Sequence, residues 1–265
     1  MNTDELLAHA DSGTLWPAER AALQSANVPQ AYRMQLDLRA ARIARGERPR
    51  GFKIGFTNRT IWPRYDVSAP IWGTVWDHTV QLGEDKGTVT LANICQPRIE
   101  PECVLGIAAE PPADADLQQL FECLDWVAPG FEIVQSHCAD WKFLASETIA
   151  DGGLHARLLV GQRTLARELA MDAAELEATL AHCAVSLYCD DALVDGGIGA
   201  SVLDGPLHAL RYLLLELQNC PGAPRLKAGD VVTTGTWTDA WPVQPGQRWR
   251  AEFEPPLSTL EAELN

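Results

Sequence analysis

Residues 96–105 read QPRIEPECVL, and this stretch decides which fold the rest of the chain is expected to adopt. Polar and apolar residues alternate along it, which is typical of a β-strand with one face toward a core. The period of two places Arg98, Glu100 and Glu102 on the same face. A buried carboxylate without a partner costs on the order of several kcal/mol, so each glutamate needs a cation, strong hydrogen-bond donors or a proton.

A third carboxylate, Glu132, lies inside a second apolar stretch, APGFEIV at residues 128–134. Three carboxylates with no histidine or thiolate in the pattern would suit a hard cation such as Mg²⁺ or Mn²⁺ rather than Zn²⁺. Acid pairs are also common on half-solvated strands, where they stay exposed or pair with a residue such as Arg98. The spacing alone leaves both interpretations open, and the exposed arrangement is the commoner of the two.

A single charge, Lys53, interrupts the apolar stretch GFKIGFTN at residues 51–58. Such a lysine usually extends outward to water, and otherwise it lies in a cleft where its ammonium group meets an anion. Gly51 and Gly55 flank it and permit the close approach of a ligand or of backbone. We therefore favour the cleft for Lys53.

The chain of 265 residues is 46% hydrophobic and 22% charged, which is ordinary for a folded protein and excludes disordered and collagen-like classes. This length fits one mid-sized domain, or a core domain with an appendage, at ~100 to 200 residues per domain. Lys and Arg total 21 against 36 Asp and Glu, a net charge of −15. The surplus would repel nucleic acid and anionic membranes, so neither is an expected partner.

The cysteines argue against a disulfide framework and against a zinc site. They are odd in number, seven, and show neither CxxC nor Cys/His finger spacing. The N-terminus, MNTDELL, is acidic where a signal peptide would be basic, and no apolar run reaches the ~18 residues that span a bilayer. These features predict a cytoplasmic protein.

The first part of the chain is expected to be helical. Thr3 is an N-cap candidate followed by acidic residues, and residues 29–46 repeat apolar side chains at helical spacing. From Gly51 the chain changes to short runs rich in Val, Ile, Thr and Trp between turn residues. The change predicts a helical segment, residues 1–50, and a β-rich domain, residues 51–265.

Strands are expected to outnumber helices in the β-rich part. The two do not alternate strictly, so an α+β fold is expected rather than a doubly wound parallel sheet. Predicted helices cover residues 115–124 and 204–220, the second with Asp204 as its N-cap and Pro206 in its first turn. The predicted strands are residues 51–56, 71–76, 88–92, 98–107, 127–134, 155–160, 184–188, 231–234 and 248–253.

Further motifs accompany the carboxylates in a fixed order. They are KIGFTN (53–58), PIWG (70–73), QPRIEPE (96–102), FEIV (131–134), DW (140–141), IAD (149–151) and LKAGDVVTTG (226–235). Together they resemble the 2-keto-4-pentenoate hydratase branch of the fumarylacetoacetate hydrolase superfamily, which also contains the 4-oxalocrotonate decarboxylases. The resemblance runs from about residue 31 to about residue 253. Its E-x-E pattern with a later Glu is specific to the superfamily, whereas the choice among activities is much less specific.

The resemblance implies that Glu100, Glu102 and Glu132 bind Mg²⁺ or Mn²⁺ and that Lys53 is an active-site cation. It favours metal binding over exposed glutamates, because a cation offsets the desolvation cost of the three carboxylates. The implied fold is a mixed β-roll like the C-terminal domain of fumarylacetoacetate hydrolase, with flanking helices and a helical N-terminal segment, in a homo-oligomer. Residues 51–265 would then be the metal-binding catalytic domain.

By this resemblance the chain is expected to be a hydro-lyase that adds water to a 2-hydroxy-2,4-dienoate and forms a 4-hydroxy-2-oxo acid. The pathway would be the catabolism of aromatic meta-cleavage products, and the substrate a small 2-oxo or 2-hydroxy dienoate. The metal would act as a Lewis acid toward the charge that develops on the C2 oxygen, and Lys53 would add a second positive charge. Asp77 and Asp151 are the candidates for general acid or base.

Other residues near these motifs are expected to be structural. His78 and His155 fit ordinary surface or hydrogen-bonded histidines. Trp62, Trp72 and Phe143 fit core positions better than a substrate wall, although an apolar substrate tail would need such a surface.

The chain departs from the family pattern at four positions. Gly152 stands where many relatives have Asn, Gly205 where they have His, Asp66 where the family has Gly, and Asp195 where a serine is often found. None of the four is a proposed metal ligand, so the departures leave the metal site in place and the identity of the substrate open.

Three other functions stay open. A decarboxylase of 4-oxalocrotonate-type 2-oxo-3-enedioates would use the same metal and lysine, because loss of CO₂ leaves the same dienolate. A C–C hydrolase ranks lower, since residues 51–72 offer no histidine to activate water. A non-catalytic subunit in complex with a pathway enzyme ranks lower too, because it would have no reason to keep four costly charges in apolar strands.

Overall fold

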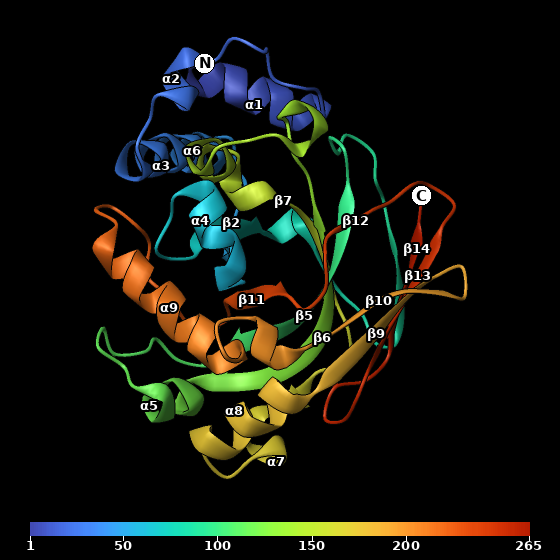
Figure 1. Ribbon diagram of the computed structural model, residues 1–265. Coiled ribbons are helices and arrows are strands. Elements are labelled where there is room, and N and C mark those ends of the chain that lie inside the picture. The colour runs from blue at the N-terminus through green and yellow to red at the C-terminus, as the bar shows by residue number, and fades with distance from the viewer.

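The computed structural model describes residues 1–265, which form two β-sheets with helices packed around them (Figure 1). The larger sheet has the order β2 (Ile71–Trp76), β1 (Pro49–Gly55), β11 (Val231–Thr236), β5 (Arg98–Ile107), β6 (Leu124–Val134), β7 (His155–Val160) and β3 (Val80–Leu82). Two short strands extend it, β12 (Trp241–Pro242) beside β5 and β8 (Thr164–Leu165) beside β6. The smaller sheet has the order β10 (Ala192–Ile198), β9 (Ala184–Cys189), β13 (Arg248–Phe253), β14 (Leu260–Leu264) and β4 (Lys86–Val89).

Both sheets mix parallel and antiparallel pairs: β1 runs parallel to β11, and β14 runs parallel to β4. The expectation of an α+β fold with a mixed, curled sheet is therefore confirmed. The predicted strands agree with the structure residue for residue at β2, β5, β7 and β13. Strand β10 was not predicted because its Asp195, Gly196 and Gly197 disfavour a strand, and its pairing with β9 overrides that local preference.

The helices lie outside the sheets (Figure 1). They are α1 (Thr3–Ser12), α2 (Ala21–Gln24), α3 (Val28–Ala44), α4 (Trp62–Tyr65), α5 (Leu117–Glu122), α6 (Ala145–Ala150), α7 (Ala166–Leu169), α8 (Ala173–His182) and α9 (Pro206–Asn219). Five 3₁₀ turns occupy Arg59–Ile61, Asp77–Thr79, Ala139–Trp141, Gly152–Leu154 and Gly199–Ser201. No helix is both long enough and apolar enough to cross a bilayer.

Two predicted helix caps are wrong by one residue. The N-cap of α1 is Asn2 instead of Thr3, because the Asn2 side chain accepts the N–H of Glu5 while Glu5 accepts the N–H of Asn2. At α9 the cap position is Gly205, and Asp204 instead accepts a hydrogen bond from Arg59.

Helices α2 and α3 pack on α6, and α1 packs on α3. A small apolar cluster joins Leu6, Leu23 and Leu38 of these helices to Cys138 and Ala150. Helix α3 ends just before residue 45 and β1 begins at residue 49, so the change from helix to strand falls where the composition changes. The division into two domains stays a prediction.

The register of the larger sheet positions the three glutamates. Strands β5 and β6 are antiparallel, and Glu100 pairs with Glu132 while Glu102 pairs with Gly130. On the other side of β5, strand β11 pairs Thr236 with Glu102 and lies next to β1, which carries Lys53. Carboxylates 32 residues apart in the sequence, at positions 100 and 132, thus lie directly across a strand pair.

Candidate active site and metal centre

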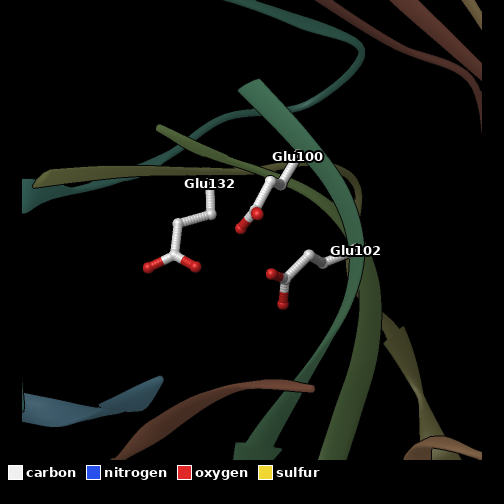
Figure 2. A group of neighbouring side chains, drawn as sticks. All are labelled: Glu100, Glu102 and Glu132. Carbon is white, nitrogen blue, oxygen red and sulfur yellow. The ribbon is translucent and has the colours of Figure 1, made fainter. Parts of the chain in front are cut away.

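Three carboxylates converge at the centre of the larger sheet. Glu100 and Glu102 come from β5 and Glu132 from β6, and Figure 2 shows their carboxylate groups turned toward one another. One oxygen from each lies within 4.8 Å of the others. Glu102 and Glu132 are 0% exposed, so the interpretation of exposed strand glutamates is wrong for them. Pairing with Arg98 is not seen, because Arg98 donates to the carbonyl of Ala240 instead.

Two buried oxygens of this cluster receive no hydrogen bond from the protein. Oε2 of Glu102 accepts the backbone N–H of Gly235 at 2.7 Å, but its Oε1 is buried without a hydrogen bond. Oε2 of Glu132 lies 3.1 Å from Nζ of Lys53 as an ion pair, yet it receives no well-aligned hydrogen bond. A buried acceptor with no donor is costly, and a hard divalent cation would satisfy these oxygens directly. The donor set therefore fits Mg²⁺ or Mn²⁺.

Gly235 must be a glycine for this arrangement. Its φ is +103°, which L side chains rarely adopt, and a Cβ at this position would lie 2.0 Å from Oγ1 of Thr57. The positive φ that glycine adopts at residue 235 allows its backbone N–H to reach Glu102.

The pKa values in the cluster are set by three carboxyl groups that lie close to one cation, Lys53. Burial, together with the neighbouring Glu132, raises the pKa of Glu100 to about 7 although Lys53 opposes the shift. Burial also raises the pKa of Glu102 well above its ordinary value, and the other two glutamates add to this. For Glu132 burial acts in the same direction, but Lys53 and His155 outweigh it and hold its pKa below the ordinary value. A divalent cation would supply the positive charge that Glu100 and Glu102 lack.

Lys53 lies in the cleft and not on the surface. Its side chain on β1 is buried, and Lys53 lines a cavity of about 470 Å³ together with Glu100. Burial lowers the pKa of Lys53, but Glu132, Glu100 and Glu102 outweigh that effect and hold its pKa above the ordinary value. Lys53 therefore carries a full positive charge beside the cavity.

His155 was expected to be an ordinary histidine, and the structure places it directly behind the cluster. Its Nδ1 lies 2.7 Å from Oε1 of Glu132 and its Nε2 lies 2.8 Å from Oγ1 of Thr79. An ionised carboxylate only accepts, so Nδ1 of His155 is the donor. The only signal in the sequence was that His155 opens the predicted strand 155–160, and its place beside Val134 of β6 comes from the strand pairing.

The two predicted proton-transfer residues lie in different places. Asp151 ends α6 and is buried, where its carboxylate accepts from Nδ1 of His137 at 2.6 Å and from the backbone N–H of His137 at 3.1 Å. It does not line the large cavity but lines a small pocket of about 30 Å³, which His155 also lines. Asp77 lies in an exposed turn after β2, bonded to backbone N–H groups, and lines neither space. The roles predicted for both stay predictions.

No protein-family model matches the chain. The chain is 30% identical to a 2-hydroxyhexa-2,4-dienoate hydratase of Comamonas testosteroni over 230 residues, which is 86% of this chain and 83% of the relative. It is 29% identical to a 4-oxalocrotonate decarboxylase of a Pseudomonas species over 227 residues, 86% of this chain and 83% of the relative.

A similar solved structure is the 4-oxalocrotonate decarboxylase of Pseudomonas putida G7 in complex with magnesium and adipate. It superposes with a TM-score of 0.87 over 99% of this chain and 95% of that one, at 22% identity. At this identity the likeness establishes a shared fold.

Proposed function

Because the chain belongs to the family of 2-keto-4-pentenoate hydratases and 4-oxalocrotonate decarboxylases in the fumarylacetoacetate hydrolase superfamily, we propose that it is a hydratase of 2-hydroxy-2,4-dienoates. The observation that carries the proposal is the cluster of Glu100, Glu102 and Glu132 beside a cavity that Lys53 lines. In this reaction the dienol moves the proton of its C2 hydroxyl group to C5, and water then adds OH to C4 and H to C3. The product is a 4-hydroxy-2-oxo acid, as expected in the breakdown of aromatic ring-cleavage products.

Glu100, Glu102 and Glu132 would hold the metal ion, Mg²⁺ or Mn²⁺. The buried oxygens without donors support this assignment, and the complex of the Pseudomonas putida G7 decarboxylase with magnesium agrees with it. When bound, the ion would supply Lewis acidity toward the substrate's carboxylate and C2 oxygen. The chain's own groups supply the rest of the chemistry.

Lys53 would bind and orient the anionic end of the substrate. Its ammonium group is charged, buried and held at 3.1 Å from Glu132, so little reorganisation is needed when the substrate arrives. A fixed positive charge of this kind stabilises the enolate-like oxygen that develops as water adds to C4. His155 would keep Glu132 ionised and correctly oriented, both to hold the metal ion and to pair with Lys53.

Proton transfer at C3, C5 and the attacking water needs a further group, and Asp151 and Asp77 are proposed for it. Asp151 has the better location, since the turn that follows it brings Gly153 to the cavity wall beside the Lys53 side chain. Asp77 is exposed and would need a water chain or a movement to reach the substrate.

Decarboxylation of a 2-oxo-3-enedioate is the second candidate. It is favoured by a relative of that name at 29% identity, against 30% for the hydratase. The same cluster would serve, since cleavage of the C–CO₂ bond leaves its electron pair in the dienolate that Lys53 stabilises. C–C hydrolysis ranks below both, because no histidine lines the large cavity to activate water.

The test offers the purified protein 2-hydroxypenta-2,4-dienoate and, separately, 2-oxohex-3-enedioate, each with Mg²⁺. Loss of ultraviolet absorbance and release of CO₂ are followed in parallel. Turnover of the first without CO₂ supports the hydratase, and CO₂ from the second would select the decarboxylase. No reaction with either compound would point to a larger substrate or to a non-catalytic partner subunit.

We also expect a homo-oligomer that acts in the cytoplasm, alone or in a complex with an enzyme of the same pathway. Light scattering coupled to gel filtration tests the oligomer.

A further inference from the structure

Four aromatic side chains form a continuous row along one wall of the large cavity. Phe56 stacks on Tyr65 with ring centroids 4.6 Å apart, Tyr65 stacks on Phe143 at 5.6 Å, and Phe143 lies 6.0 Å from Trp141. All four line the cavity and are only partly buried. Phe143 packs against the apolar cluster of Leu6, Leu23 and Leu38 as a core residue would, and it also lines the cavity. We call these four residues the aromatic wall.

The aromatic wall is brought together by tertiary structure. Phe56 follows β1, Tyr65 ends α4, and Trp141 and Phe143 lie in and after the 3₁₀ turn that precedes α6. Arg98 stacks on Trp141 from outside the cavity, with its guanidinium carbon 4.3 Å from the ring centroid. This contact keeps the Trp141 ring in place, and partly exposed rings held in this way are suited to cover an apolar group of a ligand.

The charges of the residues that line the cavity disfavour a second anionic group on the substrate. Lys53 is the only cation among the lining residues, whereas Glu100, Asp195 and Asp239 are acidic. Asp195 is fixed in place, because its carboxylate accepts from the N–H of Asp239 at 3.1 Å and from the indole N–H of Trp241 at 2.9 Å. A substrate carboxylate that extended past Lys53 would meet these acids and no second lining cation, because Arg98 lies behind the Trp141 ring and donates to the carbonyl of Ala240.

The size of the cavity agrees with a larger substrate than a five-carbon acid. Its volume of about 470 Å³ lies in the range of about 300–1,000 Å³ that is usual for pockets of drug-sized ligands. A short dienoate bound at Lys53 would fill only part of a cavity of this volume.

We propose that the substrate carries an uncharged apolar or aryl group at the end remote from its carboxylate, and that the aromatic wall binds this group. Asp195 and Asp239 act as specificity residues that disfavour dicarboxylates. This inference rests on the proposed function, since it assigns the substrate class of the same site.

The test compares three substrates with the Mg²⁺-loaded protein: 2-hydroxypenta-2,4-dienoate, its 5-phenyl derivative and 2-hydroxyhexa-2,4-dienedioate. We expect kcat/KM to be at least about tenfold higher for the phenyl compound than for the five-carbon compound, mainly through a lower KM, and lowest for the dicarboxylate. Hydration of the five-carbon compound with equal or higher kcat/KM would overturn the inference and leave the hydratase proposal standing. Preference for the dicarboxylate would also overturn it.

Variants at Phe143 and at its neighbour distinguish a contribution of the aromatic wall from general effects of mutation on activity. Phe143→Ala should lower the ratio of the two kcat/KM values, phenyl over five-carbon, by roughly tenfold, and Phe143→Leu should restore part of it. Leu144→Ala is the matched control, because Leu144 is the exposed neighbour that does not line this cavity. An unchanged ratio in Phe143→Ala contradicts the assignment.

The acidic residues are tested in the same way. Asp239→Asn should raise the relative kcat/KM for the dicarboxylate several-fold, while Asp114→Asn, which removes the same charge in the loop before α5, should not. Equal effects of the two changes would show that only the net charge matters and would remove Asp239 from the proposal.

A binding measurement decides the inference even if no substrate is turned over. Calorimetric titration compares the binding of 2-oxopentanoate with that of 5-phenyl-2-oxopentanoate, which differ only in the phenyl group. Both acids are saturated and cannot be hydrated. If the wild type binds the phenyl acid more tightly and Phe143→Ala does not, the aromatic wall is supported even when the proposed reaction is not observed. Equal binding overturns the inference.

Discussion

His155 and Glu132 face each other between neighbouring strands, with Nδ1 of His155 2.7 Å from Oε1 of Glu132 and both side chains buried. The other ring nitrogen of His155 lies 2.8 Å from Thr79, so the ring has a fixed orientation. Glu132 in turn forms an ion pair with Lys53. A proposed metal ligand is therefore held from two sides by groups that are not themselves ligands.

Replacing His155 should weaken metal binding. His155→Ala removes the donor that orients Glu132, and loss of such a partner typically costs about 10–100-fold in metal affinity. His155→Asn keeps a side-chain N–H near the same place and should retain part of the affinity. Calorimetric titration with Mn²⁺ measures both variants, and wild-type affinity in His155→Ala would show that Glu132 needs no support from this side.

Glu102→Gln should have opposite effects on stability with and without metal. A carboxyl group whose pKa is higher in the folded protein destabilises the fold once the pH exceeds its ordinary pKa, and Glu102 is such a group. In chelator at pH 8 the variant should melt at the same temperature as the wild type or higher, because the uncharged amide avoids this cost. With Mg²⁺ the wild type should gain stability and the variant should gain little.

The control for that comparison is Glu168→Gln, an exposed residue on α7 with no side-chain partner. It should follow the wild type in both buffers. An equal gain from Mg²⁺ in Glu102→Gln would remove Glu102 from the proposed ligand set.

Removing the charge of Lys53 should affect both stability and catalysis. Lys53→Met leaves Glu132 buried without its cation, and breaking a buried ion pair from one side costs roughly 3 kcal/mol or more. Because Mg²⁺ would compensate part of this loss, the melting temperature of the variant should respond to the metal more strongly than that of the wild type. We expect kcat/KM to fall by at least about a hundredfold with or without that compensation.

Two comparisons make the Lys53 result interpretable. Lys142→Met changes an exposed lysine and should alter neither property. Lys53→Arg keeps the charge and should restore stability better than activity, since a guanidinium group does not match the position of the ammonium group. Full activity in Lys53→Met would exclude a role in binding the substrate anion.

The pair of His137 and Asp151 should make stability depend on pH. Burial lowers the pKa of His137, but Asp151 at 2.6 Å outweighs it and raises the pKa above the ordinary value. The stabilisation by protonated His137 is therefore complete below the ordinary histidine pKa of about 6.5 and is lost as the pH rises through the higher value in the folded protein. Compared with wild type, His137→Asn should lose on the order of 1 kcal/mol more at pH 5.5 than at pH 9.

Urea unfolding at several pH values measures this difference. His182→Asn serves as the control, because His182 is exposed near the end of α8 and its Nδ1 donates only to the carbonyl of Ala178 in the same helix. A constant difference between wild type and His137→Asn across the pH range would contradict the assigned ion pair.

The local residue pattern was sufficient to predict the bounds of several strands and to predict that Glu100 and Glu102 share one strand face. The alternation of residues 98–107 predicted β5 residue for residue, and it predicted that Glu100 and Glu102 point to the same side. This works because the side-chain period of a strand is a property of the backbone and needs no partner strand. The bounds of β2, β7 and β13 were predictable for the same reason.

Contacts between distant segments were decided by tertiary structure alone. The pairing of β5 with β6 sets Glu132 opposite Glu100, and the position of β7 brings His155 to Glu132. From the sequence, by contrast, Asp77 was as good a candidate as Asp151, although it lies in an exposed turn.

The aromatic wall also depends on contacts between distant segments that the sequence does not reveal. Each of its four residues is an ordinary aromatic in its own segment, and Phe143 looked like a core residue for that reason. They form one surface because packing brings the ends of three segments to the same cavity. The sequence by itself determined which residues carry charge in apolar strands, and only the tertiary structure decided which of them meet, because strand pairing and packing depend on the whole chain.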